Sequence, residues 1–304
     1  MTPNRRRFLT AATGFGAALL TGCGPATPPT VRVAAGEVGG FYHAFTAMLA
    51  DVAAETATIR IHPVTTMGSL ANLDLLTRGD ADAALTLADA AQHTPDHLTA
   101  IGRVYENYLQ LAVRADAPLT DIRQLRGARL SLGAPGSGAT FTGERLLRAA
   151  DLDPDTDLTV THLALRDAVT ALTDRTADAL LWAGGVPTAL LDVPRSLRLI
   201  DMGALAQPMR DRFGYLYDRV IIPADAYPAT PAVQTIGVAN LLVTTPALPD
   251  DTADALTELL ITHADRLVPA VAAGTQFLDV RSLIGTDGIG LHPGAARVYR
   301  RYHG

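Results

Sequence analysis

Hydrophobic and polar positions alternate along the chain in stretches of two kinds. Short runs of four to eight residues, at least half of them apolar, predict strands, and longer stretches with apolar residues every three or four positions predict amphipathic helices. The predicted strands cover residues 31–35, 59–62, 83–87, 109–113, 129–132, 158–161, 179–182 and 236–243. The predicted helices cover residues 41–54, 70–77, 141–149, 165–172 and 251–268.

This order of elements favours an α/β fold in which helices cover mostly parallel sheets. The strands and helices form two series. The strand at 109–113 leads out of the first series, and the strand at 236–243 leads back. We therefore predict two lobes joined by two crossover strands. Lobe I is expected to comprise residues 31–111 and 240–304, and lobe II residues 112–239.

The N-terminal segment has the pattern of a bacterial lipoprotein signal. Three arginines precede an apolar stretch at residues 8–20, and the run Leu-Thr-Gly ends at Cys23. The apolar stretch is too short to span a bilayer as a helix, which needs about 20 residues. The pattern predicts a signal peptide at 1–22, lipidation of Cys23 and a linker at 23–30. Twin-arginine and general export both stay open, and the alternative is that Cys23 is an ordinary buried thiol.

The composition excludes several function classes. All 25 basic residues are arginine, and after residue 22 the chain has 22 arginines against 31 acidic residues. This negative net charge argues against nucleic acid as a partner and against electrostatic binding to anionic lipid. Without lysine there is no Schiff-base chemistry, and Cys23 as the single cysteine leaves no disulfide or thiol catalysis. We expect no enzymatic activity and no cofactor.

Three glycine-rich loops each follow a predicted strand and open a predicted helix. Their glycines allow a close approach of the backbone to a ligand, and the free N–H groups of a helix start attract anions. The alternative is that they are tight turns with helix caps. Because they are divided between two lobes, they favour a ligand in the cleft. The loops cover residues 36–42, 68–73 and 133–140.

The third loop does not support an enzymatic site. It has the glycine spacing of a phosphate-binding loop, but Ala139 stands where lysine is required. Ser137 is not in a G-x-S-x-G motif, so a serine hydrolase is a distant alternative. His93 and His97 have the spacing of metal ligands on a helix, but Pro95 lies between them and no third ligand is evident.

Two aromatic residues lie beside glycine turns. Trp182 ends a predicted strand just before the turn at 184–187, where it either forms a wall of the cleft or packs in a core. Tyr42 follows Gly40 and either offers its hydroxyl to a carboxylate or packs inwards.

In these loops and in several other motifs, the chain resembles the TAXI solute-binding proteins of TRAP transporters, which have the type II periplasmic binding-protein fold. The resemblance covers nearly all of residues 31–304. It rests on an ordered set of motifs: Gly39-Gly40-Phe41-Tyr42, Gly68-Ser69-Leu70-Ala71-Asn72-Leu73, Gly79-Asp80-Ala81-Asp82 with Asp89, residues 125–138, Gly184-Gly185-Val186-Pro187, residues 222–228 and His292-Pro293-Gly294-Ala295.

The resemblance implies capture of a small organic acid or amino acid, glutamate-like or a dicarboxylate, for a TRAP-type membrane permease. It implies an exported monomer, anchored by lipid outside the cytoplasmic membrane or in the periplasm. The alternative function is that of a ligand-sensing lipoprotein of the same fold that acts on a membrane receptor. The expected ligand-binding residues are Gly40, Phe41, Tyr42, Ser69, Asn72, Ser137, Gly138, Ala139, Thr140, Trp182, Gly184, Gly185, Val186 and Pro187.

The chain departs from the family pattern at two places. His43 stands where the family usually has a second tyrosine, and Leu87-Ala88 stands where it often has a glutamine before the aspartate. The lost amide weakens the inference to glutamate and leaves the fold unaffected.

Overall fold

The computed structural model describes residues 28–94, 97–192, 196–228, 230–269 and 278–303. The predicted signal peptide and Cys23 lie outside this part of the chain. Among the described helices, none is long and apolar enough to cross a membrane.

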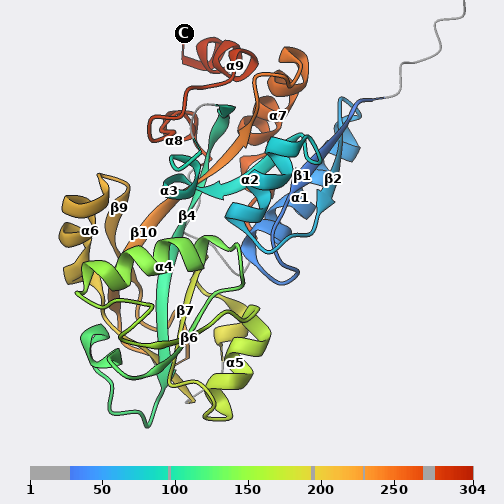
Figure 1. Cartoon of the computed structure of the whole chain (residues 1–304). Helices are drawn as coiled ribbons and strands as arrows, with labels where there is room; N and C mark the ends of the chain where they lie inside the picture. Colours follow the sequence, from blue (N-terminus) through green and yellow to red (C-terminus); the bar gives the residue numbers. More distant parts are fainter. Residues whose placement is uncertain (1–27, 95–96, 193–195, 229, 270–277, 304) are drawn as a thin grey trace, which may run out of the picture.

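The strands of the described chain form one curled sheet of ten strands flanked by helices (Figure 1). Its main path runs β2-β1-β3-β10-β4-β7-β5-β6, while β8 pairs with β4 and β9 pairs with β10. The strands are β1 (Thr30–Ala34), β2 (Arg60–Val64), β3 (Ala83–Leu87), β4 (Thr99–Arg114), β5 (Arg129–Leu132), β6 (Thr159–Thr161), β7 (Ala179–Gly184), β8 (Leu197–Leu199), β9 (Tyr217–Ile222) and β10 (Val233–Thr244).

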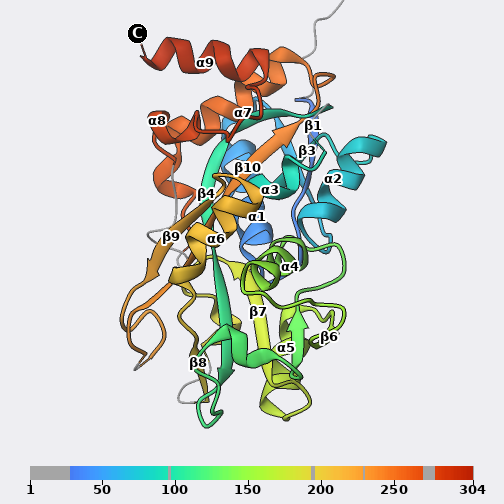
Figure 2. The same ribbon diagram turned by 60° about the vertical axis from the view of Figure 1, so that its left-hand side comes forward.

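Two long strands, β4 and β10, connect the halves of this sheet. The first part of β4 pairs with β10, and its last part, Tyr108 to Val113, pairs with β7. Figures 1 and 2 show β4 running from one half of the molecule to the other. We use lobe I for the half with β1–β3 and lobe II for the half with β5–β7. The crossover strands predicted at 109–113 and 236–243 lie within β4 and β10.

The sheet is parallel in its outer parts and antiparallel in its middle. β1 is parallel to β2 and β3, and β5 is parallel to β6 and β7. β10 is antiparallel to both β3 and β4, and β7 is antiparallel to β4. The predicted mostly parallel sheets therefore join through antiparallel strands, because each crossover strand returns against its neighbour.

Helices cover the sheet, and one of them lies at the boundary between the lobes (Figure 1). Helix α1 packs on β2, α2 on β3, and α4 and α5 on β7. In both ribbon views α4 lies where the two lobes meet. The helices are α1 (Phe41–Thr56), α2 (Ser69–Arg78), α3 (Ala88–Ala91), α4 (Gly138–Ala149), α5 (Leu165–Thr173), α6 (Ala206–Phe213), α7 (Asp250–Thr262), α8 (Val280–Leu283) and α9 (Pro293–His303).

The helix predicted for 251–268 is shorter than expected. It ends at Thr262, because His263 leaves helical backbone angles at φ −125° and ψ 25°, and residues 264–266 form a separate 3₁₀ turn. Its acidic start agrees with the prediction, since Asp250 and Asp251 lie in its first turn, where they complement the helix dipole.

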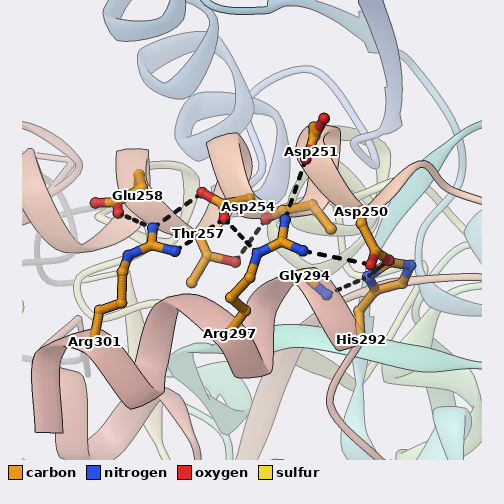
Figure 3. A network of polar contacts seen from close by, with 10 residues as sticks. Asp250, Asp251, Asp254, Thr257, Glu258, His292, Gly294, Arg297 and Arg301 are labelled. Atoms are coloured by element: carbon orange, nitrogen blue, oxygen red, sulfur yellow. Dashed lines mark hydrogen bonds and ion pairs between the residues drawn. The ribbon is translucent and has the colours of Figure 1, made fainter. Parts of the chain in front are cut away.

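A polar network attaches the C-terminal helix α9 to α7 (Figure 3). Asp254 accepts hydrogen bonds from Arg297 Nε and Arg301 Nη1, each at 3.1 Å. Arg301 also contacts Glu258, and the two arginines lower the pKa of the Asp254 carboxyl below its usual range. One carboxylate shared by two guanidinium groups is a stronger arrangement than isolated surface pairs.

Candidate functional site

A small cavity of about 50 Å³ lies between the two lobes. Lobe I contributes the start of α1, the start of α2 and the middle of β4, and lobe II contributes the start of α4 and the end of β7. The lining residues are Gly36, Glu37, Gly40, Phe41, Tyr42, Met67, Gly68, Ser69, Leu87, Tyr105, Asn107, Ser137, Gly138, Ala139, Trp182, Ala183 and Gly184. We call this space the inner cavity.

Most of the residues predicted to bind ligand line this cavity. The nine that do are Gly40, Phe41, Tyr42, Ser69, Ser137, Gly138, Ala139, Trp182 and Gly184. Gly185 and Pro187 line an adjoining cavity of about 250 Å³, together with His43 and Thr188. Trp182 also lines a third cavity at the boundary between the lobes, so its ring is a common wall of all three.

Three predicted residues support the site from behind and do not line any of these cavities. The side chain of Asn72 donates to the backbone carbonyl of Leu85 at 2.7 Å and contacts Thr66. Thr140 donates its hydroxyl to the carbonyls of Leu132 and Ala134 at 2.8 Å, which fixes the loop before α4.

Val186, the third of these residues, is buried in the core of lobe II. Its side chain therefore contributes to packing beneath the turn and not to the cavity wall.

The start of α1 and the start of α2 are joined by hydroxyl groups. The Tyr42 hydroxyl lies 3.0 Å from Ser69 Oγ and donates to Asn240 Oδ1 on β10. Ser69 Oγ also accepts from the backbone N–H of Leu87 at 3.1 Å. Burial raises the pKa of the Tyr42 hydroxyl above its usual range, so the group is neutral and acts as a hydrogen-bonding wall.

The lobes contact each other directly beside the cavity. The N–H groups of Leu70 and Ala71, at the start of α2, both donate to the carbonyl of Gly136 from lobe II. We expected these N–H groups to be free for an anion, and in this respect the prediction is wrong. The adjacent Ser137 caps α4 by accepting from the N–H of Thr140 at 3.1 Å.

The turn after β7 is positioned by a buried polar network. Gln110 on β4 donates to the Gly185 carbonyl and to Thr188 Oγ1, each at 3.1 Å. The Tyr227 hydroxyl donates to Gln110 Oε1 and accepts from the Thr188 N–H at 2.9 Å. Gly184 must lack a side chain, since a Cβ would lie 2.3 Å from Trp182 Nε1. The turn therefore holds the Trp182 ring in place.

Three polar residues that line the inner cavity were not among the predicted ligand-binding residues: Glu37, Tyr105 and Asn107. Tyr105 is fully buried and Asn107 is 4% exposed. The Tyr105 hydroxyl, Asn107 Oδ1 and Glu37 Oε1 are buried atoms without a hydrogen-bond partner among the described residues. Buried polar atoms are nearly always paired, so three such atoms around one cavity indicate that it binds a ligand. The i, i+2 spacing of Tyr105 and Asn107 in β4 is the one signal that places both on the same face.

The described residues hold no cluster of three or more histidine, cysteine, aspartate or glutamate side chains that is placed to bind a metal ion. The His93 ring lies beside Phe141 in a tilted arrangement, with 5.4 Å between ring centroids. This contact gives the His93 ring a packing role.

Comparisons with known proteins agree with this architecture. The profile of the NMT1-like family matches residues 33–301. A protein of Bordetella bronchiseptica RB50 superposes with a TM-score of 0.60 at 16% identity, over 91% of this chain and 99% of its own.

Two binding proteins of ABC transporters are also similar in structure. The substrate-binding protein of an amino acid ABC transporter has a TM-score of 0.50 at 12% identity, over 78% of this chain and 95% of its own. A binding-protein component of a phosphonate ABC transporter from Pseudomonas aeruginosa has a TM-score of 0.51 at 11% identity, over 77% of this chain and 74% of its own. These likenesses confirm the predicted two-lobed periplasmic binding-protein fold.

Proposed function

Because this chain belongs to the NMT1-like family, we propose that it is a solute-binding protein of a membrane transporter, without catalytic activity. The observation that carries the proposal is the inner cavity, where the unpartnered polar atoms of Tyr105 and Asn107 lie between the two lobes. Solved structures of similar fold include binding proteins of amino acid and phosphonate transporters, which supports the same role here.

We propose that the ligand is a small amino acid or organic acid and that the membrane partner is a TRAP-type permease. The support for both is the TAXI-like set of motifs, above all the loops at 39–42, 68–73 and 133–138. The similar structures of ABC-transporter proteins support the binding role and leave the type of permease to experiment.

Capture would proceed by closure of the lobes about β4 and β10. Both strands connect the lobes, so bending within them changes the width of the gap between α1 and the start of α4. A ligand that contacts both lobes favours the closed state by its differential affinity for it. The permease would then recognise that closed state.

We expect at least one member of a panel of amino acids and small carboxylates to stabilise the purified protein. A ligand at 100 times its dissociation constant adds about 2.7 kcal/mol to the free energy of unfolding, which raises the melting temperature by about 5 °C or more. Differential scanning fluorimetry measures this shift. If no compound raises the melting temperature, the proposed ligand class is wrong.

We propose that the protein is exported and anchored at Cys23 to the outer face of the cytoplasmic membrane. We expect Cys23→Ser to move the protein from the membrane fraction to the soluble fraction, because the thiol that accepts the lipid is lost. Immunoblots of cell fractions measure the distribution. A variant that stays membrane-bound would contradict the anchor. Solute affinity should not change, because the cavity is formed by residues 36–184.

A further inference from the structure

The inner cavity is rich in hydrogen-bond acceptors that lack a donor. Asn107 Oδ1 and Glu37 Oε1 accept from no described residue, and the buried Tyr105 hydroxyl is also unpartnered. Carboxylate and amide oxygens accept hydrogen bonds and do not donate them. When Glu37 is ionised, a ligand group that satisfies both Asn107 Oδ1 and Glu37 Oε1 is a donor. A ligand carboxylate has only acceptors to offer to these two atoms.

The lining of the inner cavity carries negative charge and no positive charge. Among the described residues that line it, Glu37 is the one charged residue, and none is arginine, lysine or histidine. The other oxygen of Glu37 accepts from the backbone N–H of Leu165 in lobe II at 3.4 Å. Burial raises the pKa of the Glu37 carboxyl, which means that its ionised form needs a compensating positive charge.

Four aromatic rings complete the wall: Phe41, Tyr42, Tyr105 and Trp182. Phe41 and Tyr105 lie in contact, with 3.7 Å between ring centroids, and Tyr42 meets Tyr105 edge-on at 6.0 Å. Aromatic faces attract cations within about 6 Å, most strongly where water is excluded. The faces of these rings add a second reason for a positive ligand group.

The size of the cavity limits what it holds. Its volume of about 50 Å³ compares with roughly 10–15 Å³ for one water molecule on the same measure. It has room for a head group of a few non-hydrogen atoms. The remainder of a longer ligand would pass Trp182 into the adjoining cavity of about 250 Å³.

From this geometry we propose that the inner cavity binds the primary ammonium group of its ligand, between Glu37, Asn107 and the aromatic wall. The inference rests on the proposed solute-binding function and narrows its ligand class to amines and amino acids, excluding dicarboxylates. The three N–H donors of an ammonium group match the acceptor atoms of Asn107, Glu37 and Tyr105.

Matched pairs of compounds test the ammonium site. L-alanine and propionate form one pair, and L-glutamate and glutarate form another, since the members of each pair differ by the amino group. We expect isothermal titration calorimetry to show the amino compound of at least one pair binding about 10- to 100-fold tighter than its partner, as expected for lost charge-assisted hydrogen bonds.

Two variants locate the effect. Glu37→Gln removes the charge and Asn107→Leu removes the amide acceptor, and we expect each to lower the amine preference about 10-fold. Asp174→Asn is the control, because Asp174 is exposed at the end of α5 and lines none of the three cavities, so the same loss of charge there should leave the preference unchanged. Melting temperatures of the variants check that they are folded.

The outcomes separate the two proposals. Binding of the acids with equal or greater affinity than the amines overturns the ammonium site and leaves the solute-binding function in place. An amine preference that survives in both variants also overturns it. Failure of every compound to bind overturns the proposed ligand class and the ammonium site with it.

Discussion

Replacing Asp89 by alanine is expected to destabilise the protein by about 3 kcal/mol, the largest effect on stability among the described polar groups. Asp89 is fully buried at the start of α3. Its Oδ2 accepts from Thr142 Oγ1 at 2.8 Å and from the Tyr217 hydroxyl at 3.0 Å, and Arg145 Nη1 lies 3.8 Å away. The alanine variant leaves the two buried hydroxyls without their acceptor and removes the counter-charge of Arg145, whose Nη1 donates to the Tyr217 hydroxyl at 2.8 Å.

The position of Asp89 makes this network a connection between the lobes. α3 follows β3 of lobe I, whereas Thr142 and Arg145 belong to α4. Burial raises the pKa of the Asp89 carboxyl, and the hydrogen bond from Thr142 and the charge of Arg145 oppose that rise. The partners therefore compensate for the burial of the carboxylate. When the carboxylate is removed, its partners stay buried without their interactions with it, and this lowers the free energy of unfolding.

Urea unfolding at neutral pH measures the change, with Asp174→Ala as the control. Asp174 is an exposed residue at the end of α5, where a substitution should alter the free energy of unfolding by no more than about 0.5 kcal/mol. Equal stabilities of the Asp89 and Asp174 variants would show that the network contributes nothing.

Gly138→Val is expected to weaken ligand binding by about 10- to 100-fold while both lobes remain folded. Gly138 is the first residue of α4, and a Cβ there would lie 2.6 Å from both Ser69 Oγ and Leu87 Cδ1 of lobe I. The Ser69 hydroxyl is held by Tyr42 and the Leu87 N–H, so it cannot move aside freely. Overpacking of this kind destabilises a structure by about 1–3 kcal/mol. The clash forms only when the lobes are closed, so it destabilises the closed state relative to the open state and weakens ligand binding.

Isothermal titration with the tightest ligand of the panel measures the loss. Gly290→Val is the matched control, because a Cβ at Gly290 meets no atom within 4 Å. An unchanged dissociation constant for Gly138→Val would show that the ligand does not require the contact between α4 and lobe I.

Much of the fold was predictable because its local signals are strong. β3 and β5 have the predicted bounds, 83–87 and 129–132, since β3 is a mostly apolar run and β5 alternates polar and apolar residues. β4 was predicted only for 109–113, although it begins at Thr99. Glu106 and Asn107 break the apolar pattern of its first part, although both are buried in the folded chain. β9 was missed as well.

The site was predictable only where glycine turns mark it. The loops around Gly40, Ser69 and Ser137 lie at the same cavity because the parallel strands of lobe I and those of lobe II run in opposite directions, so the carboxyl ends of both groups face each other between the lobes. Tyr105 and Asn107 were missed, because the face that they occupy depends on the pairing of β4 with β10. Thr140 was predicted as a ligand contact and is a structural residue, since its hydroxyl bonds within its own loop. Local sequence does not distinguish these two roles of a hydroxyl.

The decisive measurement is a crystal structure of the complex with the tightest ligand of the panel. We expect one ligand in the inner cavity, within hydrogen-bond distance of Asn107 and in contact with the ring of Trp182. A ligand bound outside the boundary between the lobes, with Tyr105 and Asn107 still unpartnered, would contradict it.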